Sequence, residues 1–108
     1  MITVKQVWER KLAENLTDEQ YVYALADAFN KNHAEFDLPE SVEIVKLEDG
    51  WYELREYKDG KLQEHVEDWT EEGEGILVYP GVQHPLDGLI YEFERQWYVE
   101  PLVIGIYR

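Results

Sequence analysis

The sequence predicts an α+β fold in which one or two N-terminal helices pack on an antiparallel β-meander of about five to six strands. Two observations support this prediction. In the first third of the 108-residue chain, apolar residues recur with helical spacing. From residue 42 onward, apolar residues alternate with polar ones, and Asp-Gly turn signals separate the strand-like segments. The length suits one hydrophobic core, so we expect residues 1–108 to form a single domain.

The helical region begins at a recognisable signal. Thr17-Asp18-Glu19-Gln20 is a capping-box pattern, which satisfies free backbone N–H groups at a helix N-terminus. The residues behind it that share one helical face predict a buried stripe on a helix of roughly four turns: Val22, Leu25, Ala26, Phe29, His33 and Phe36. Pro39 ends this helix at the latest. An earlier helix over residues 3–14 is also expected, with a short strand at Ile2 and Val4 as the alternative.

Two Asp-Gly pairs mark turns in the second half of the chain. Asp49-Gly50 and Asp59-Gly60 each lie between strand-like residues, a pattern typical of two-residue hairpin turns. Such turns fix a register that pairs opposite charges across the strands: Lys46 with Glu53, and Arg55 with Glu64. Further strands are expected at residues 76–79, 89–94 and 97–107.

The chain is strongly acidic, with a formal net charge of −14 from 24 acidic and 10 basic residues. Six of the acids, and no Lys or Arg, fall within residues 64–74. Self-repulsion within such a cluster opposes compaction, so the cluster points to a partner rather than to the fold. Direct binding to DNA, RNA or an anionic membrane is disfavoured, because those surfaces attract Lys and Arg.

Composition limits the remaining classes of protein. A hydrophobic content of 44 % predicts a folded domain rather than an acidic disordered tail. The absence of cysteine excludes disulfides and thiolate metal sites, and Ser41, the only serine, has no G-x-S-x-G setting. No N-terminal stretch has the pattern of a signal peptide, and the apolar run at residues 102–107 is too short to span a bilayer. We therefore expect a soluble, cytoplasmic protein.

The acidic region also holds aromatic residues. Carboxylates interleaved with Trp and Tyr describe a surface suited to a basic, partly apolar partner protein. We predict these partner-binding residues, with the tryptophan as the anchor: Glu64, Glu67, Asp68, Trp69, Glu71, Glu72 and Glu74. At least one of Trp51, Tyr52, Tyr57 and Trp69 is expected in the core. The alternative interpretation of the acids is a solvated surface that keeps the domain soluble.

In charge and size, the chain resembles the small acidic DNA-mimic inhibitors made by phages and mobile elements. These include anti-CRISPR, anti-restriction and uracil-DNA-glycosylase-inhibitor proteins, which share this general character rather than a sequence motif. The resemblance implies a non-enzymatic inhibitor without a cofactor, which occupies a basic, nucleic-acid-binding surface of its target protein. It implies no residue roles and no oligomeric state.

The histidines define an alternative, a small metal-binding enzyme that uses His65 and His84. Part of the chain resembles the second motif of cupins, in which a glycine, a Pro-Gly turn and a metal-binding histidine are spaced along the chain: Gly75, Pro80, Gly81, His84 and Gly88. Glu67 would join the two histidines as a ligand if their strands were neighbours. The first cupin motif is absent, and a Pro-Gly turn explains the same residues more simply. A second alternative is a structural subunit whose aromatic surface closes a homo-oligomer.

Overall fold

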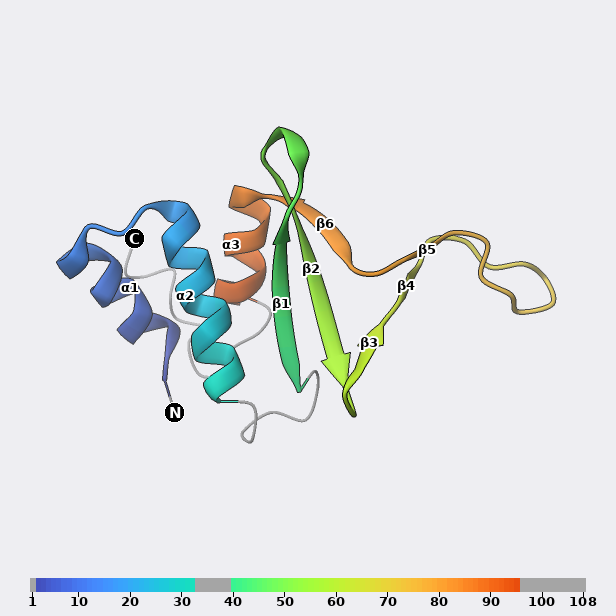
Figure 1. The fold of residues 1–108 in the computed structure, drawn as a ribbon, viewed down its shortest axis with the longest axis horizontal. Coiled ribbons are helices and arrows are strands. Elements are labelled where there is room, and N and C mark those ends of the chain that lie inside the picture. Colours follow the sequence, from blue (N-terminus) through green and yellow to red (C-terminus); the bar gives the residue numbers. More distant parts are fainter. Residues whose placement is uncertain (1, 33–39, 96–108) are drawn as a thin grey trace.

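The computed structural model describes residues 2–32 and 40–95. Two N-terminal helices, α1 (Val4–Glu14) and α2 (Asp18–Lys31), precede the strands, and a third helix, α3 (Leu86–Arg95), follows them. The helices lie together on one side of an antiparallel sheet (Figure 1). The predicted α+β class, with two N-terminal helices and an antiparallel sheet, is therefore confirmed.

Both N-terminal helices begin at a threonine capping box. At α2, the Thr17 hydroxyl accepts a hydrogen bond from the Gln20 N–H at 3.1 Å, and the Gln20 side chain accepts one from the Thr17 N–H at 2.9 Å. This is the predicted box. Thr3 and Gln6 form the same arrangement at α1, so this segment is a helix rather than a strand. Each box satisfies N–H groups that the first turn of a helix leaves unpaired.

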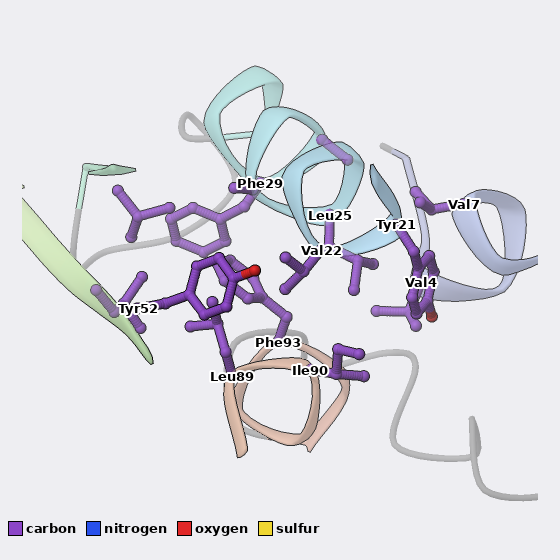
Figure 2. Packing of buried hydrophobic residues seen from close by; sticks show 14 residues of the cluster. Val4, Val7, Tyr21, Val22, Leu25, Phe29, Tyr52, Leu89, Ile90 and Phe93 are labelled. Atoms are coloured by element: carbon purple, nitrogen blue, oxygen red, sulfur yellow. The ribbon is translucent and has the colours of Figure 1, made fainter. Parts of the chain in front are cut away.

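An apolar core lies between α2, α3 and the sheet (Figure 2). The predicted stripe is buried from Val22 to Phe29, whereas its last two members, His33 and Phe36, lie outside the described residues. Tyr52, 3 % exposed, is the core aromatic expected from the acidic region. The buried apolar residues come from all three helices and two strands: Val4, Val7, Tyr21, Val22, Leu25, Ala26, Ala28, Phe29, Val42, Tyr52, Leu54, Leu89, Ile90 and Phe93.

Strand β2 (Trp51–Lys58) forms the centre of the sheet, and β1 (Ser41–Lys46) pairs with it in antiparallel register. A side chain covers part of the outer edge of β1. The Asn30 amide of α2 donates to the Val42 carbonyl at 3.0 Å and accepts from the Val42 N–H at 2.8 Å. Asn30 thus takes the place of a neighbouring strand at that position, which hinders pairing with another chain.

The other side of β2 carries two short strands in line. β3 (Lys61–Gln63) lies opposite residues 56–58, and β6 (Val82–Pro85) lies opposite residues 51–54. Arg55 is the position of β2 between these two partners. β3 and β6 are therefore the two halves of one interrupted strand, and the chain between them leaves the sheet and returns to it.

The first hairpin differs from the predicted register by one residue. Glu48–Gly50 form a three-residue 3-10 turn between Leu47 and Trp51, whose backbones are hydrogen-bonded, so the turn is one residue longer than predicted and Val45 faces Glu53. The Asp-Gly pair does adopt positive φ angles, 60° and 78°, but one more residue joins the loop. The predicted pairing of Lys46 with Glu53 is therefore wrong, and Lys46 Nζ lies 3.3 Å from Glu19 Oε2 on α2 instead.

The second turn is the predicted two-residue turn. Asp59 and Gly60 have φ angles of 53° and 74°, as a type I′ turn requires. The register is the predicted one as far as Gln63 opposite Glu56, but β3 ends there, so the predicted pair of Arg55 with Glu64 is not part of the sheet. Arg55 Nε instead lies 2.6 Å from Glu53 Oε1 on the same strand.

The strand predicted at residues 89–94 is part of helix α3, so this prediction is wrong. The sequence L-I-Y-E-F-E alternates as a strand would, but it also fits a helix. Leu86, Leu89, Ile90 and Phe93 follow each other at i, i+3, i+4 and i+7, and all four pack in or against the core. Burial of this apolar stripe against the core favours the helix over the strand.

The remaining strand predictions have mixed outcomes. Of residues 76–79, only β5 (Val78–Tyr79) is a strand, and it pairs with β4 (His65–Val66). Residues 97–107 lie outside the described residues. The described part of the chain holds six strands, of which β1, β2 and β3 form a meander.

Candidate functional site

A hairpin projects from the sheet between β3 and β6, and we call its residues 64–80 the arm. The arm extends away from the helices along the longest dimension of the molecule, 51 Å (Figure 1). β4 and β5 form its base, where His65 faces Tyr79, and Trp69 bridges to Gly75 farther out. No residue of the arm is buried. We call the other described residues, 2–32, 40–63 and 81–95, the body. The arm therefore extends from the body and is not part of its core.

A tight turn closes the tip of the arm. The Gly73 N–H donates to the Thr70 carbonyl at 3.0 Å, and Gly73 has a φ of 87°, which glycine adopts without strain. The Thr70 N–H donates to the Glu74 carbonyl at 2.7 Å, and the Thr70 hydroxyl accepts from the Glu74 N–H at 3.0 Å. These bonds hold Glu71 and Glu72 at the turn itself. The sequence T-E-E-G, with glycine ending a three-residue loop, is the signal that could have predicted this turn.

The structure places every predicted partner-binding residue on the arm, and all of them are exposed. From the base through the outgoing strand and the tip they are Glu64, Glu67, Asp68, Trp69, Glu71, Glu72 and Glu74. The indole of Trp69 is among the most exposed large apolar groups of the described residues, at 64 %. The predicted residues therefore all lie on one projecting hairpin.

Among the described residues, the carboxylates of the arm have no Lys or Arg partner. His65 Nε2 lies 3.6 Å from Glu67 Oε1. Because the arm holds six acidic residues and no Lys or Arg, its charge is not neutralised locally. Solvent and salt alone reduce the repulsion between these groups.

Carboxylates of the body have a different environment. Many of them lie within ion-pair distance of a basic side chain on the same or a neighbouring element: Lys5–Glu9, Arg10–Glu14, Lys11–Asp18, Asp27–Lys31, Glu19–Lys46, Glu43–Arg55 and Glu53–Arg55. Such surface pairs contribute little to stability, but they neutralise charge where it arises. The arm therefore carries −6 of the net charge of −14 on 17 of the 108 residues.

The returning half of the arm exposes apolar residues that the sequence analysis did not assign to the site. Residues 76–79 are all exposed, with Ile76 at 59 % and Leu77 at 45 %. They lie across the hairpin from acids, because the Glu67 N–H donates to the Leu77 carbonyl and the Ile76 N–H to the Asp68 carbonyl, both at 2.8 Å. The run I-L-V-Y is visible in the sequence, but its exposure depends on the lack of a covering layer, which no local pattern reveals.

Gly81 joins the arm to the sheet. A Cβ at this position would overlap the backbone oxygen of Leu54, so only glycine lets the returning chain pass so close to β2. Two open hollows of about 240 Å³ and 190 Å³ lie at this root, and both are lined by His65, Gly81 and Val82. The path of the arm is thus set by a close backbone contact.

Two titratable side chains near the root are partly buried. Burial, and then the nearby Glu92 carboxylate, raise the pKa of Glu56, while His65 acts in the opposite direction. Burial lowers the pKa of His84, and Glu92 acts against this shift. Desolvation disfavours the charged form of each group. At the root, Glu56 and His84 are therefore both shifted toward their neutral forms by partial burial.

The metal-site alternative requires His65, Glu67 and His84 to converge. His65 faces Tyr79 within the arm, whereas His84 faces Tyr52 in the sheet. Within residues 2–32 and 40–95, no group of three His, Asp or Glu side chains is arranged to hold a metal ion. The structure thus brings His65 and Glu67 together without assembling a ligand set around His84 in those residues.

Across the same two ranges, no helix has both the length and the apolar character needed to cross a membrane. Comparison of the whole chain with protein-family models, with curated proteins and with solved structures found no match.

Proposed function

We propose that this protein is a non-enzymatic binding module that inhibits a target protein by placing the arm on the target's basic, nucleic-acid-binding surface. One observation carries the proposal. Among the described residues, six carboxylates without Lys or Arg partners project from the body on a hairpin that lies outside the core. Their repulsion opposes folding, whereas a positively charged partner offsets it on binding.

The shape of the arm supports this proposal. The six carboxylates are distributed from the base of the arm to its tip, so they form a row of separated negative charges along the hairpin, as phosphates do along a nucleic acid. The tip turn extends this row by holding Glu71 and Glu72 beyond the paired residues. A narrow hairpin can enter a groove that a broad acidic face cannot.

Nucleic-acid-binding proteins offer the complementary surface. They neutralise phosphates with clustered Lys and Arg, and such clusters attract any extended polyanion. Electrostatic steering would bring the arm to that surface quickly, and its bound carboxylates would then exclude nucleic acid. The chain itself offers nucleic acid no such surface, since its net charge is −14.

The test begins with capture of a target from a cell lysate on the tagged protein, followed by binding measurements with the purified target. The arm variant combines Glu67→Gln, Asp68→Asn, Glu71→Gln and Glu72→Gln. The matched body variant removes the same charge from exposed positions outside the arm: Glu9→Gln, Glu14→Gln, Asp27→Asn and Glu48→Gln. We expect the arm variant to bind at least about tenfold more weakly, and the body variant to bind nearly as tightly as the wild type.

Salt and competition provide the second measurement. Raising salt from about 0.1 M to about 1 M shortens the Debye length from about 10 Å to about 3 Å, which should slow association of the wild type far more than that of the arm variant. Added nucleic acid should compete with the protein for the target. Equal affinity of the two variants, or simultaneous binding of nucleic acid and this protein, would contradict the proposal.

A further inference from the structure

We infer that the arm imitates single-stranded rather than duplex nucleic acid, so that its partner is a protein whose groove binds single-stranded DNA or RNA. This inference rests on the proposed function and specifies the chemistry of the partner. It follows from the apolar half of the arm, which the carboxylates alone do not explain.

Both faces of the arm expose apolar side chains. Its exposed members have fractional exposures between 36 % and 64 %: Trp69, Ile76, Leu77, Val78 and Tyr79. Single exposed apolar residues are ordinary on protein surfaces, but a group of them with a polar rim marks an interaction site. The rim here consists of the carboxylates of the arm.

Charge and apolar surface run side by side along the hairpin. The backbone bonds of Glu67 to Leu77 and of Ile76 to Asp68, both 2.8 Å, place an acid next to an apolar residue at two successive positions. Side chains directly across a strand pair have Cβ atoms roughly 5 Å apart. Successive residues of a strand point to opposite faces, so Glu67 and Leu77 lie on one face of the hairpin and Asp68 and Ile76 lie on the other. Each face of the arm therefore places an acid beside an apolar side chain.

A single nucleic-acid strand has the same two-part composition. Its phosphates run along one side, and its unstacked bases offer apolar faces on the other. A duplex encloses the faces of its bases within the stack and presents phosphates and base edges to proteins. The apolar side chains of the arm therefore have a counterpart in a single strand but not in a duplex.

The grooves that bind these two ligands differ accordingly. Single-strand grooves combine a basic track for the backbone with aromatic side chains on which bases stack. In such a groove, Trp69 and Tyr79 would contact the aromatic side chains while the acids contact Lys and Arg. Duplex-binding surfaces are more polar and strongly positive, so the same apolar residues would gain little there.

A second copy of this chain is a poorer partner for the arm. Two arms that paired side by side would each bring six acidic residues and no Lys or Arg. Like charges that face each other across strands are destabilising. Charge complementarity thus favours a basic groove over self-association.

The experiment uses the full chain and the target obtained by capture on the wild-type arm. Labelled oligo-dT, oligo-U and a mixed-sequence DNA duplex, each about 20 nucleotides or base pairs long, serve as probes, since this length exceeds a single-strand site. We expect the target to bind one of the single strands at least about tenfold more tightly than the duplex at matched salt. We also expect the wild-type chain to displace that strand.

Two apolar variants separate this inference from the charge effect. Trp69→Thr and the double variant Ile76→Thr/Leu77→Thr keep every carboxylate and place a strand-favouring residue at each position. Trp51→Thr is the matched control, because Trp51 is 45 % exposed but lies on β2, outside the arm. We expect each arm variant to need at least about tenfold more protein to displace the single strand, and the control to match the wild type.

The outcomes distinguish the two proposals. If the target prefers the duplex, or if the apolar variants compete as well as the wild type while the carboxylate variant fails, the single-strand inference is wrong and the proposed function stands. If the wild type displaces no nucleic acid from the target, the proposed function itself fails. A wild-type dimer that dissociates in the Ile76→Thr/Leu77→Thr variant would identify a second copy as the occupant and overturn both.

Discussion

The body and the arm of this protein differ in the burial of their side chains and in the pairing of their carboxylates. The body has a buried apolar core, in which Phe29 and Phe93 are no more than 1 % exposed, and many of its carboxylates lie beside a Lys or Arg. In the arm, residues 64–80, no side chain is buried, and Glu67, beside His65, is the one arm carboxylate with an ion-pair partner among the described residues. Stability and the proposed binding function are therefore carried by separate residues of one short chain.

This separation has a physical basis. A residue that holds the core cannot also present its side chain to a partner, and a repulsive cluster of acids is least harmful where it contacts no core residue. Elements with few buried contacts also open most readily, and binding elements are often drawn from such regions. The arm meets both conditions, because it leaves the sheet through the interruption between β3 and β6.

The largest difference between the two regions should appear when one aromatic residue is removed from each. Phe93→Ala deletes a ring with 0 % exposure that packs between α3 and α2, and it should lower the free energy of unfolding by about 3–5 kcal/mol. Trp69→Ala should change it by less than about 0.5 kcal/mol, because the indole is 64 % exposed. Urea unfolding of both variants measures the contrast. A comparable loss in both would mean that the arm supports the body.

A smaller effect is expected where the two regions meet. Gly81→Ala forces a Cβ against the Leu54 backbone, so the root of the arm must shift, at a cost of about 1–3 kcal/mol. Gly73→Ala is the matched substitution at the tip, where the positive φ of 87° strains only a turn that can relax locally. We expect it to cost less than about 1 kcal/mol in global unfolding. Equal losses would show that the close contact at Gly81 does not restrain the fold.

The sequence predicted correctly those elements that depend only on residues close together in the chain. The capping box at Thr17 and the stripe behind it needed only neighbouring residues, and both are present in the structure. The acidic residues of the arm were likewise identified from composition alone. The turn at Asp59-Gly60 followed from the positive φ angles that this pair favours.

The predictions that failed depended on distant parts of the chain. An Asp-Gly pair fixes backbone angles but not loop length, so Glu48 joined the first turn and shifted its register. Residues 89–94 satisfy both the strand and the helix period, and only packing of Phe93 against α2 selects the helix. The exposure of residues 76–79 could not be foreseen, because a strand-like apolar run is normally covered by a second layer.

The response to pH offers a finer test at the root. Burial lowers the pKa of His84 below its ordinary value of 6.5, so the folded protein keeps this group neutral while the unfolded chain takes up a proton as pH falls through that value. The free energy of unfolding should therefore decrease below about pH 6.5, by at most about 0.8 kcal/mol at about pH 6 for this one group. His84→Gln should reduce the decrease. Urea unfolding at fixed ionic strength measures it, and an identical pH profile in both proteins would contradict the assignment.

The smallest effect on stability should come from the largest change in sequence. Gln63 faces Glu56 and Val82 faces Leu54, so one residue opposite Arg55 would join β3 to β6 as a continuous strand. Replacing residues 64–81 by a single threonine spans the required distance, about 6.6 Å between the flanking Cα atoms. The replacement removes no residue of the core cluster, and a shorter connection lowers the entropy of the unfolded chain.

The armless variant should therefore unfold at a urea concentration no lower than the wild type does, while binding to the captured target is lost. These two results together would show that residues 64–81 serve the partner and not the fold. A control in which three threonines replace the same residues tests the geometry, because two surplus residues must bulge out of the joined strand and should reduce stability. The single-threonine variant also lacks Gly81, so Gly81→Ala shows whether the loss of this glycine alone disturbs the fold. If the single-threonine variant fails to fold while Gly81→Ala is well tolerated, then residues 64–80 themselves stabilise the body. The separation between body and arm would then be wrong.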